Sequence, residues 1–419
     1  MMKSTDRREF IRLGRAALAT LGLSSQAPKG LAATRASGPM EGDDYYDKLG
    51  VTKIINAAGT YTALTASTMP APVQAAVAKA AKHPVRLHEL QIKAGEYLAR
   101  RLKCESAIVT AGASSGLTLG TAACLMVANN CDIRDIPQEV MRQKNEVLIQ
   151  KSHRYGYDQA LVACGVKMIE VQTRDEYDKA FSAKTIMAHF FNAAEGGSIS
   201  REDWISIAHN HGVPCFNDAA ADMPPIANLW NYTQMGFDLV TFSGGKGIRG
   251  PQNAGLLLGK RNLIEAAAKN NNPYDGIARG QKVAKEQIVG MVAAVDWLLE
   301  QTDESMAKEF QARAERVMGE LKGLPGVQAE IFTPPFANHV PHLLVRYDQE
   351  KIRISPQNVV KAMREGTPSI ELNPASGSTH ASAGLPADGK TLVVGVWMME
   401  EGEDRIVGKR LREVLKAAA

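Results

Sequence analysis

A lysine in a glycine-rich loop is the strongest chemical signal in this chain. Lys246 follows the apolar run Leu239–Phe242 and has a glycine on each side. Asp218 follows a second apolar run, Val213–Asn217, 28 residues upstream of the lysine. A lysine amine can form a Schiff base with an aldehyde cofactor, and an aspartate can keep a pyridine nitrogen protonated. The pair predicts pyridoxal 5'-phosphate (PLP), with Lys246 and Asp218 at opposite sides of its ring.

A phosphate seat is predicted where a strand-like run, Ala107–Thr110, meets a helix rich in alanine and leucine. Backbone amides at a helix start, reinforced by serine hydroxyls, bind phosphate. Serine and glycine are also preferred at an ordinary helix start, so the pattern alone fits a simple cap. Ser243, three residues before the lysine, offers a second phosphate contact. The seat itself is Gly112, Ala113, Ser114 and Ser115.

Two further side chains follow strand-like runs and face the same cofactor in this interpretation. His153 comes after Val147–Gln150 and is placed to stack on the pyridine ring from the face opposite Lys246. An exposed loop histidine fits that position equally well. Asn192 comes after Thr185–Phe191 and is placed to donate to the phenolic oxygen of the cofactor.

Arg249 and Arg279 are candidates for binding a substrate carboxylate, because the planar guanidinium group pairs with carboxylates in a bidentate way. Either residue could equally be a surface cation without a binding role.

A phosphate-binding P-loop is the competing interpretation of the Lys246 loop. It requires glycine at position 240 and serine or threonine at 247, where the chain has Val240 and Gly247, so it fails twice.

The elements that must position these residues are short, apolar and mostly non-alternating runs. This composition is typical of strands that helices cover on both faces. It predicts an α/β fold with a doubly wound, mostly parallel sheet, in which ligands bind at the carboxyl ends of the strands. The seven expected strands are Ala107–Thr110, Val147–Gln150, Lys167–Val171, Thr185–Phe191, Val213–Asn217, Leu239–Phe242 and Ala254–Gly259.

The rest of the chain divides into segments of different character. An N-terminal segment (43–60) precedes a large cofactor-binding domain (61–281), and apolar residues at helical spacing predict a linking helix at 282–300. A smaller α+β domain is expected at 301–419. Its elements are predicted as helix 305–322, strands 327–332 and 342–347, helix 356–365, strand 391–398 and helix 403–418, with a long loop at 373–390.

Residues 1–27 are predicted to be a twin-arginine signal peptide. Arg7 and Arg8 precede a short apolar stretch, and Ser25–Ala27 offers a small-residue cleavage site. An amphipathic helix or a disordered tail is the alternative, because motifs this short are weakly specific. Twin-arginine export carries folded proteins, which predicts a periplasmic enzyme that loads its cofactor in the cytoplasm. Residues 28–42 are predicted to be a linker.

The composition argues against a nucleic-acid-binding protein, a membrane-spanning protein and a cysteine metal site. The 419 residues carry a formal net charge of +4, which does not indicate a nucleic-acid partner. No apolar stretch is long enough to predict a stable membrane span. The five cysteines are odd in number and form no CxxC pair, so free thiols and no metal site are expected.

Three motifs resemble one known family, the bacterial selenocysteine synthase-like (L-seryl-tRNA selenium transferase-like) enzymes. The motifs are Ile55–Thr60, Asn217–Ala220 and Ser243–Gln252, and the run Glu401–Val407 also fits. The resemblance covers about residues 45–419. It implies the fold-type I PLP-dependent transferase fold, with Lys246 as the Schiff-base lysine and Asp218 as the pyridinium partner. Asn56 and Thr60, within the first motif, are expected to contact substrate.

The lysine loop is more similar to a branch of that family, the D-glucosaminate-6-phosphate ammonia-lyase-like enzymes. Members of the selenocysteine synthase-like group carry an N-terminal tRNA-binding domain that we do not find in this sequence, so an amino acid or amino-sugar acid is the expected substrate. The predicted export signal argues against a phosphorylated one. The resemblance also implies a homodimer or a larger even oligomer.

The expected function is therefore a PLP-dependent lyase that eliminates a group from Cβ of its substrate and releases ammonia and a 2-oxo acid. Racemisation or epimerisation and retro-aldol cleavage use the same lysine and remain alternatives. A binding protein that keeps the fold without catalysis is the alternative from another class, because a fold does not fix a function.

Overall fold

The computed structural model describes residues 44–192, 197–335, 337–373 and 384–419. The predicted signal peptide (1–27) and linker (28–42) lie outside these residues, as does most of the predicted loop at 373–390. None of the helices among the described residues is long and apolar enough to cross a membrane.

The chain forms two compact units, Met1–Thr52 and Lys53–Ala419. In the first unit the described residues form the short helix α2 (Tyr45–Leu49). Asp44 caps its start by accepting a hydrogen bond from the Tyr46 amide, and Gly50 ends it in a left-handed conformation. The second unit contains the elements that carry the predicted site.

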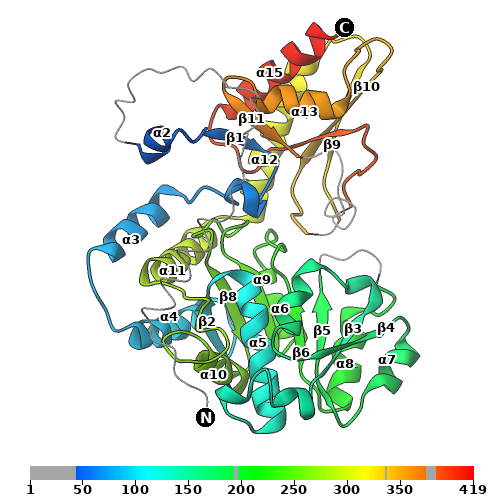
Figure 1. The fold of residues 1–419 in the computed structure, drawn as a ribbon. Helices are drawn as coiled ribbons and strands as arrows, with labels where there is room; N and C mark the ends of the chain where they lie inside the picture. The colour runs from blue at the N-terminus through cyan, green and yellow to red at the C-terminus, as the bar shows by residue number, and fades with distance from the viewer. Residues whose placement is uncertain (1–43, 193–196, 336, 374–383) are drawn as a thin grey trace, which may run out of the picture. The chain divides into compact units, whose positions relative to one another are not determined.

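A seven-stranded sheet is the centre of the second unit (Figure 1). Only β8 runs antiparallel to its neighbours, so the expected mostly parallel sheet is confirmed. In order across the sheet the strands are β2 (Ser106–Thr110), β8 (Gly255–Gly259), β7 (Leu239–Ser243), β6 (Cys215–Asp218), β5 (Thr185–Phe191), β3 (Glu146–Gln150) and β4 (Lys167–Val171).

Successive residues of the central strands enter two different hydrophobic cores. In β8, Leu256 and Leu258 belong to one core, whereas Leu257 belongs to the other. All three side chains are fully buried. Helices cover both faces, which explains why the strands are continuous apolar runs rather than alternating ones.

Helix α5 (Gly112–Asn129), cyan in Figure 1, packs directly on this sheet. Gly116 and Gly120 permit the close packing: a Cβ at Gly116 would lie 2.2 Å from Oγ1 of Thr241, and one at Gly120 would lie 2.4 Å from the Phe216 ring. The helix start is thereby fixed beside the carboxyl end of β2. The other helices of this region are α3 (Ala71–Ala81), α4 (Leu87–Arg101), α6 (Gln159–Val162), α7 (Arg174–Ala180), α8 (Arg201–Asn210), α9 (Asn228–Met235) and α10 (Arg261–Asn270).

The C-terminal part contains a smaller antiparallel sheet, ordered β12 (Leu392–Gly395), β10 (His342–Tyr347) and β9 (Val327–Phe332). It packs with α12 (Asp303–Leu321), α13 (Pro356–Arg364) and α15 (Glu403–Ala417) around a separate apolar core. Helix α11 (Lys285–Leu299) occupies the position of the predicted linking helix. The predicted strand 391–398 is too long, because pairing with β10 covers only residues 392–395.

A further pairing was not predicted from the sequence. Strand β1 (Ile54–Ala57) pairs in parallel with β11 (Ser369–Leu372), more than 300 residues away. Strand β1 is therefore built into the C-terminal part of the second unit.

Candidate active site

The carboxyl edge of the large sheet collects the predicted cofactor residues. Because β2, β3, β5, β6 and β7 run in one direction, the loops that follow them leave the same edge. Ligands in such sheets bind at that edge. The loops carry, in the same order, Gly112–Ser115, His153, Asn192, Asp218 and Lys246.

The loop that holds Lys246 needs its glycines because other backbone segments lie against them. A Cβ at Gly245 would lie 2.7 Å from Cα of Gln252, and one at Gly247 would lie 2.2 Å from the Met223 carbonyl oxygen. Ser67 holds the loop from the other side by donating a 2.7 Å hydrogen bond to the Gly245 carbonyl. The lysine backbone is thus fixed against two neighbouring segments.

The Lys246 side chain is half-buried and makes no hydrogen bond or ion pair with any described residue. Burial lowers the pKa of its amine, while the nearby Asp218 and Asp222 carboxylates oppose that shift. A lowered pKa increases the fraction of neutral amine, which is the form that attacks a carbonyl or takes up a proton.

Asp218 is buried at the carboxyl end of β6, with both carboxylate oxygens engaged. Oδ2 accepts a 2.6 Å hydrogen bond from the Tyr155 hydroxyl, and Oδ1 accepts one of 3.0 Å from the Ala220 amide. Burial raises the pKa of this carboxyl, and the two hydrogen bonds and Lys246 counteract the rise. A cation held against Asp218 would favour its ionised form further.

The predicted phosphate seat is the first turn of α5. Its amides at 112–114 have no partners within the helix, because the first turn lacks preceding carbonyls. Ser115 is buried, and its Oγ has no hydrogen-bond partner among the described residues. Ser114 is exposed, and Ser243 is half-buried at the end of β7. A buried hydroxyl without a hydrogen-bond partner is unfavourable unless a ligand supplies that partner.

Asn192 and the neighbouring polar groups form a second part of this edge. Arg201 Nε donates a 2.8 Å hydrogen bond to Asn192 Oδ1, which leaves the buried Nδ2 without a described partner. Asp222 faces the same amide and accepts a 3.1 Å hydrogen bond from the Tyr232 hydroxyl. Burial raises the pKa of Asp222 to about 6.

His153 is buried rather than exposed on its loop. Its ring packs edge-to-face on Phe190 with 4.5 Å between ring centroids, and its Nδ1 accepts a 3.3 Å hydrogen bond from the Phe191 amide. Gln150 approaches the other ring nitrogen at 3.3 Å. Burial lowers its pKa to about 4, so the imidazole is neutral at physiological pH. Stacking on a cofactor ring stays a prediction.

The two candidate arginines lie in different environments. Arg249 is half-buried in the lysine loop; its Nε donates to the Thr68 carbonyl at 2.9 Å and its Nη2 to Glu400 at 3.2 Å. Arg279 is exposed and lies 3.7 Å from the Asp275 carboxylate. Only Arg249 is built into the loop that carries Lys246.

Asn56 lies within β1, and Thr60 lies in the segment that follows it. Asn56 donates to the carbonyls of Gly59 and Ala66 and accepts from the amides of Ala58 and Gly59. Its amide therefore shapes this turn, and Thr60 is buried within it. Their contact with substrate stays a prediction.

Sequence reasoning missed Tyr155, His189 and Asp222. Tyr155 lies two residues after His153, and its hydroxyl bridges Asp218 and, at 3.2 Å, His189 Nε2. A polar residue in the apolar strand Thr185–Phe191 was the available signal for His189, and a second acid four residues after Asp218 was the signal for Asp222.

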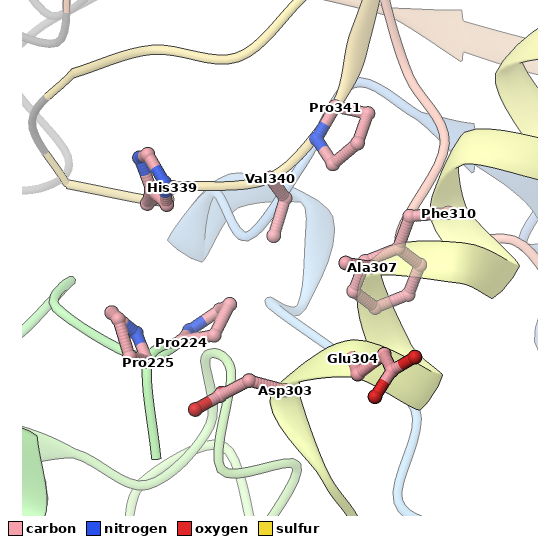
Figure 2. Close-up of a pocket in the computed structure, with 9 residues that line it drawn as sticks. All are labelled: Pro224, Pro225, Asp303, Glu304, Ala307, Phe310, His339, Val340 and Pro341. Carbon is pink, nitrogen blue, oxygen red and sulfur yellow. The ribbon is translucent and has the colours of Figure 1, made fainter. Parts of the chain in front are cut away.

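A cavity of about 380 Å³ lies beside Pro224 and Pro225 (Figure 2). Asp303, near its floor, accepts a 2.9 Å hydrogen bond from the Ile226 amide, so this carboxylate holds the neighbouring turn. The lining residues include none of the predicted cofactor residues. They are Pro224, Pro225, Asp303, Glu304, Ala307, Phe310, His339, Val340 and Pro341.

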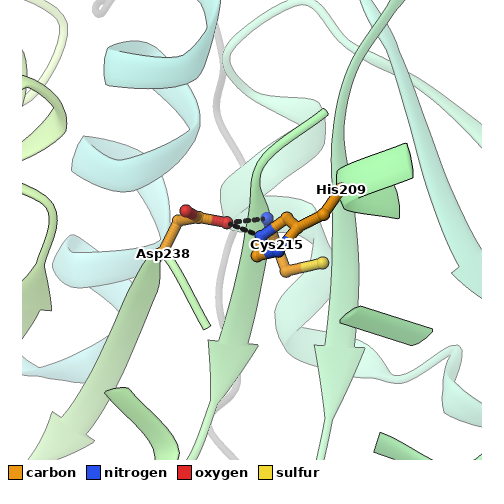
Figure 3. A group of neighbouring side chains, drawn as sticks. All are labelled: His209, Cys215 and Asp238. Atoms are coloured by element: carbon orange, nitrogen blue, oxygen red, sulfur yellow. Dashed lines mark hydrogen bonds and ion pairs between the residues drawn. The ribbon is translucent and has the colours of Figure 1, made fainter. Parts of the chain in front are cut away.

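At the opposite edge of the sheet, His209, Cys215 and Asp238 bring three potential metal ligands within 4.8 Å of one another (Figure 3). The group is already hydrogen-bonded internally. Asp238 Oδ2 lies 2.7 Å from the Cys215 amide, which donates to it, and 2.8 Å from His209 Nε2. We assign it to fixing the starts of β6 and β7.

Comparison with known proteins agrees with this architecture. A family model described as L-seryl-tRNA selenium transferase matches residues 54–331. The chain is 27% identical to the 5'-C-glycyluridine monooxygenase-decarboxylase of a Streptomyces species over 384 residues, which is 88% of this chain and 92% of that enzyme. It is 26% identical to the D-glucosaminate-6-phosphate ammonia lyase of Salmonella typhimurium over 386 residues, 89% and 98% of the two chains.

A solved structure of D-glucosaminate-6-phosphate ammonia-lyase superposes with a TM-score of 0.75 at 25% identity, covering 90% of this chain and 99% of that one. The fold-type I fold that the sequence motifs implied is therefore confirmed.

Proposed function

Because the chain belongs to the L-seryl-tRNA selenium transferase family, as its motifs implied, we propose that it is a PLP-dependent lyase. The proposed reaction is α,β-elimination from an amino acid or amino-sugar acid, with release of ammonia and a 2-oxo acid. The observation that carries the proposal is a lysine amine without a partner, half-buried near the carboxylates of Asp218 and Asp222 at the ligand-binding edge of the sheet. The near full-length similarity to an ammonia lyase supports the reaction class.

The residues present fit PLP. Ser115 Oγ and Asn192 Nδ2 are buried donors without described partners, and they match a phosphate and a phenolic oxygen respectively. Asp218 would pair with the pyridine nitrogen, and Lys246 would hold the cofactor covalently. An anionic phosphate at the first turn of α5 would also accept hydrogen bonds from the free amides of that turn.

When bound, PLP withdraws electrons from Cα of an attached amino acid. The chain's own groups would do the rest. Once replaced on the cofactor by the substrate amine, Lys246 would take the proton from Cα as a neutral amine, and the Cβ substituent would leave with the electrons of its own bond. The released enamine takes up water and yields ammonia and the 2-oxo acid. Asp222 is a buried acid near Lys246, and we propose it as the group that gives a proton to the leaving group.

Arg249 is the better candidate of the two arginines for the substrate carboxylate. It lies in the lysine loop, and Glu400, its ion-pair partner, is more than half exposed and free to move aside. The exposed Arg279 is paired only with Asp275, at 3.7 Å. Because residues 1–27 predict export, we propose an unphosphorylated amino acid or amino-sugar acid as substrate.

The test is reconstitution of the pure protein with PLP, followed by a panel of β-hydroxy amino acids and amino-sugar acids. The proposal predicts equal amounts of ammonia and 2-oxo acid from at least one compound. A protein that does not bind PLP would contradict the whole proposal.

Other products would select another reaction of the same lysine. Deuterium uptake at Cα without net consumption would indicate racemisation or epimerisation, and an aldehyde product would indicate retro-aldol cleavage. Oxygen-dependent release of carbon dioxide is a further candidate, favoured by the 27% identity to a monooxygenase-decarboxylase.

We also propose that the twin-arginine segment exports the loaded enzyme to the periplasm, that no nucleic acid binds, and that the chain assembles as a homodimer or larger even oligomer. The division into a large domain (61–281), a linking helix and a small domain (301–419) is proposed on the same sequence grounds. Cell fractionation of the full-length chain and of an Arg7→Lys/Arg8→Lys variant tests the export: the variant should stay in the cytoplasm.

A further inference from the structure

Three side chains from neighbouring elements form a hydrogen-bonded series behind the predicted cofactor partner. Asp218 ends β6, Tyr155 precedes the short 3-10 helix η5 (Gly156–Asp158), and His189 lies within β5. The Tyr155 hydroxyl is 2.6 Å from Asp218 Oδ2 and 3.2 Å from His189 Nε2. The series leads from the edge of the sheet into its core.

The single hydroxyl proton of Tyr155 decides the direction of these bonds. The charged and nearer acceptor is the Asp218 carboxylate, so the hydroxyl donates to Oδ2. His189 must then carry its proton on Nε2 and donate to the tyrosine oxygen.

The surroundings hold the two residues neutral and in place. Tyr155 stacks on Phe191 with 3.9 Å between ring centroids, and its ring is parallel to that of His189. Burial and the Asp218 carboxylate raise the pKa of Tyr155 well above its usual value. Burial lowers the pKa of the fully buried His189 to about 3. Both groups therefore remain neutral donors at working pH.

A carboxylate that receives such a donor stays ionised more readily. Burial alone pushes the proton toward Asp218, whereas the Tyr155 hydrogen bond opposes that effect. If Asp218 took the proton, the pyridine nitrogen would lose it and with it much of its power to withdraw electrons. The hydrogen bond thus favours the arrangement with the proton on nitrogen.

We propose that Tyr155 and His189 are positioning residues, which keep the Asp218 carboxylate ionised and oriented toward the pyridine nitrogen of the cofactor. This inference rests on the proposed function. It concerns one atom of the cofactor, and the test can therefore be made specific to that atom.

The experiment compares the affinity of three proteins for PLP and for the PLP analogue in which C–H replaces the ring nitrogen. The proteins are the wild type, Tyr155→Phe and the matched control Tyr157→Phe, whose side chain is 59% exposed. Loss of a hydrogen bond to a charged group should weaken PLP binding by Tyr155→Phe roughly tenfold and leave analogue binding unchanged. Tyr157→Phe should bind both compounds as the wild type does.

Equal weakening of both compounds by Tyr155→Phe would overturn the inference, because it would show a packing effect. No weakening of either compound would overturn it as well. A wild type that binds no PLP would instead contradict the proposed function. His189→Phe, which keeps a ring but removes the donor, is the second variant and should show the same selectivity at roughly threefold.

Discussion

The two ends of strands β6 and β7 use similar residue types in opposite ways. At the amino end, Asp238 accepts from the Cys215 amide and pairs with His209, so that its Oδ2 has two partners within 2.8 Å (Figure 3). At the carboxyl end, Asp218 lies near Lys246, whose amine has no hydrogen bond or ion pair among the described residues.

The difference distinguishes structure from function. A polar group that is fully paired in the folded chain stabilises the fold, and removing one partner leaves the other without a hydrogen bond. A buried donor without a partner, such as Ser115 or Asn192, costs stability and is retained where a ligand completes it. The amino end of these strands therefore stabilises the fold, and a ligand is expected at the carboxyl end.

The largest effect is expected for Lys246→Ala. Without the amine the cofactor has no covalent attachment and Cα has no base, so the rate should fall by at least about a thousandfold. The melting temperature of the cofactor-free protein should not decrease, because the lost amine had no described partner. Product formation and thermal melts measure the two effects.

Lys260→Ala is the matched control, because Lys260 is half-exposed and pairs with Glu105 at the surface. Its activity should equal that of the wild type. A Lys246→Ala variant that melts well below the wild type would mean that this lysine is structural.

The next largest effect is a pH dependence of protein stability that arises from Asp222. Its pKa in the folded protein is about 6, against 3.8 as the ordinary value, so between these pH values the folded protein keeps a proton that the unfolded chain has released. The stability of the cofactor-free protein should therefore fall as pH rises from about 4 to 6, by up to roughly 3 kcal/mol from this group.

Asp222→Asn removes that titration. Denaturant titrations at several pH values should show the variant gaining stability relative to the wild type across this window and holding the difference above it. Parallel stability curves for the two proteins would contradict the assignment of the raised pKa to Asp222.

Asp238→Ala tests the amino end of the same strands. It leaves the buried Cys215 amide without its side-chain acceptor and should lower the free energy of unfolding by about 1–3 kcal/mol. PLP affinity should not change.

Asp178→Ala is the comparison for that variant, since Asp178 makes the same 2.8 Å contact with His211 but is 62% exposed. An exposed pair contributes about 0–1 kcal/mol. If Asp238→Ala weakened PLP binding instead of stability, the contrast between the two ends would fail.

The smallest effect is expected for Ser115→Ala. PLP should bind roughly three- to tenfold more weakly, because one hydrogen bond to a charged phosphate is lost. The free protein should be at least as stable as the wild type, since the buried hydroxyl had no described partner. The exposed Ser114, changed to alanine, shows by the same titration whether its hydroxyl also contributes.

The local sequence pattern was sufficient to predict the sheet and the strand ends that carry Asp218 and Lys246. Continuous apolar runs identify buried strands, and in a mostly parallel sheet their carboxyl ends must meet. The pairing of β1 with β11 was not predictable in this way, because its two strands are separated by more than 300 residues. The strand 391–398 was predicted too long for a similar reason, since its partner β10 decides where pairing stops.

The site was predictable where a residue follows a strand and not where partners depend on packing. Asn56 was expected to contact substrate, and the sequence did not predict the four backbone contacts that engage its amide. Tyr155 and His189 lie 34 residues apart and become partners only because β3 and β5 are neighbours in the sheet. Spacing along the chain does not reveal such contacts.

Lys246 is the residue proposed to hold the cofactor. The most direct test is reduction of the PLP-reconstituted protein with borohydride, followed by proteolysis and mass spectrometry of the lysine-containing peptides. We expect a phosphopyridoxyl group on Lys246 alone, and none in the Lys246→Ala variant. Modification of a different lysine, or of none, would contradict it.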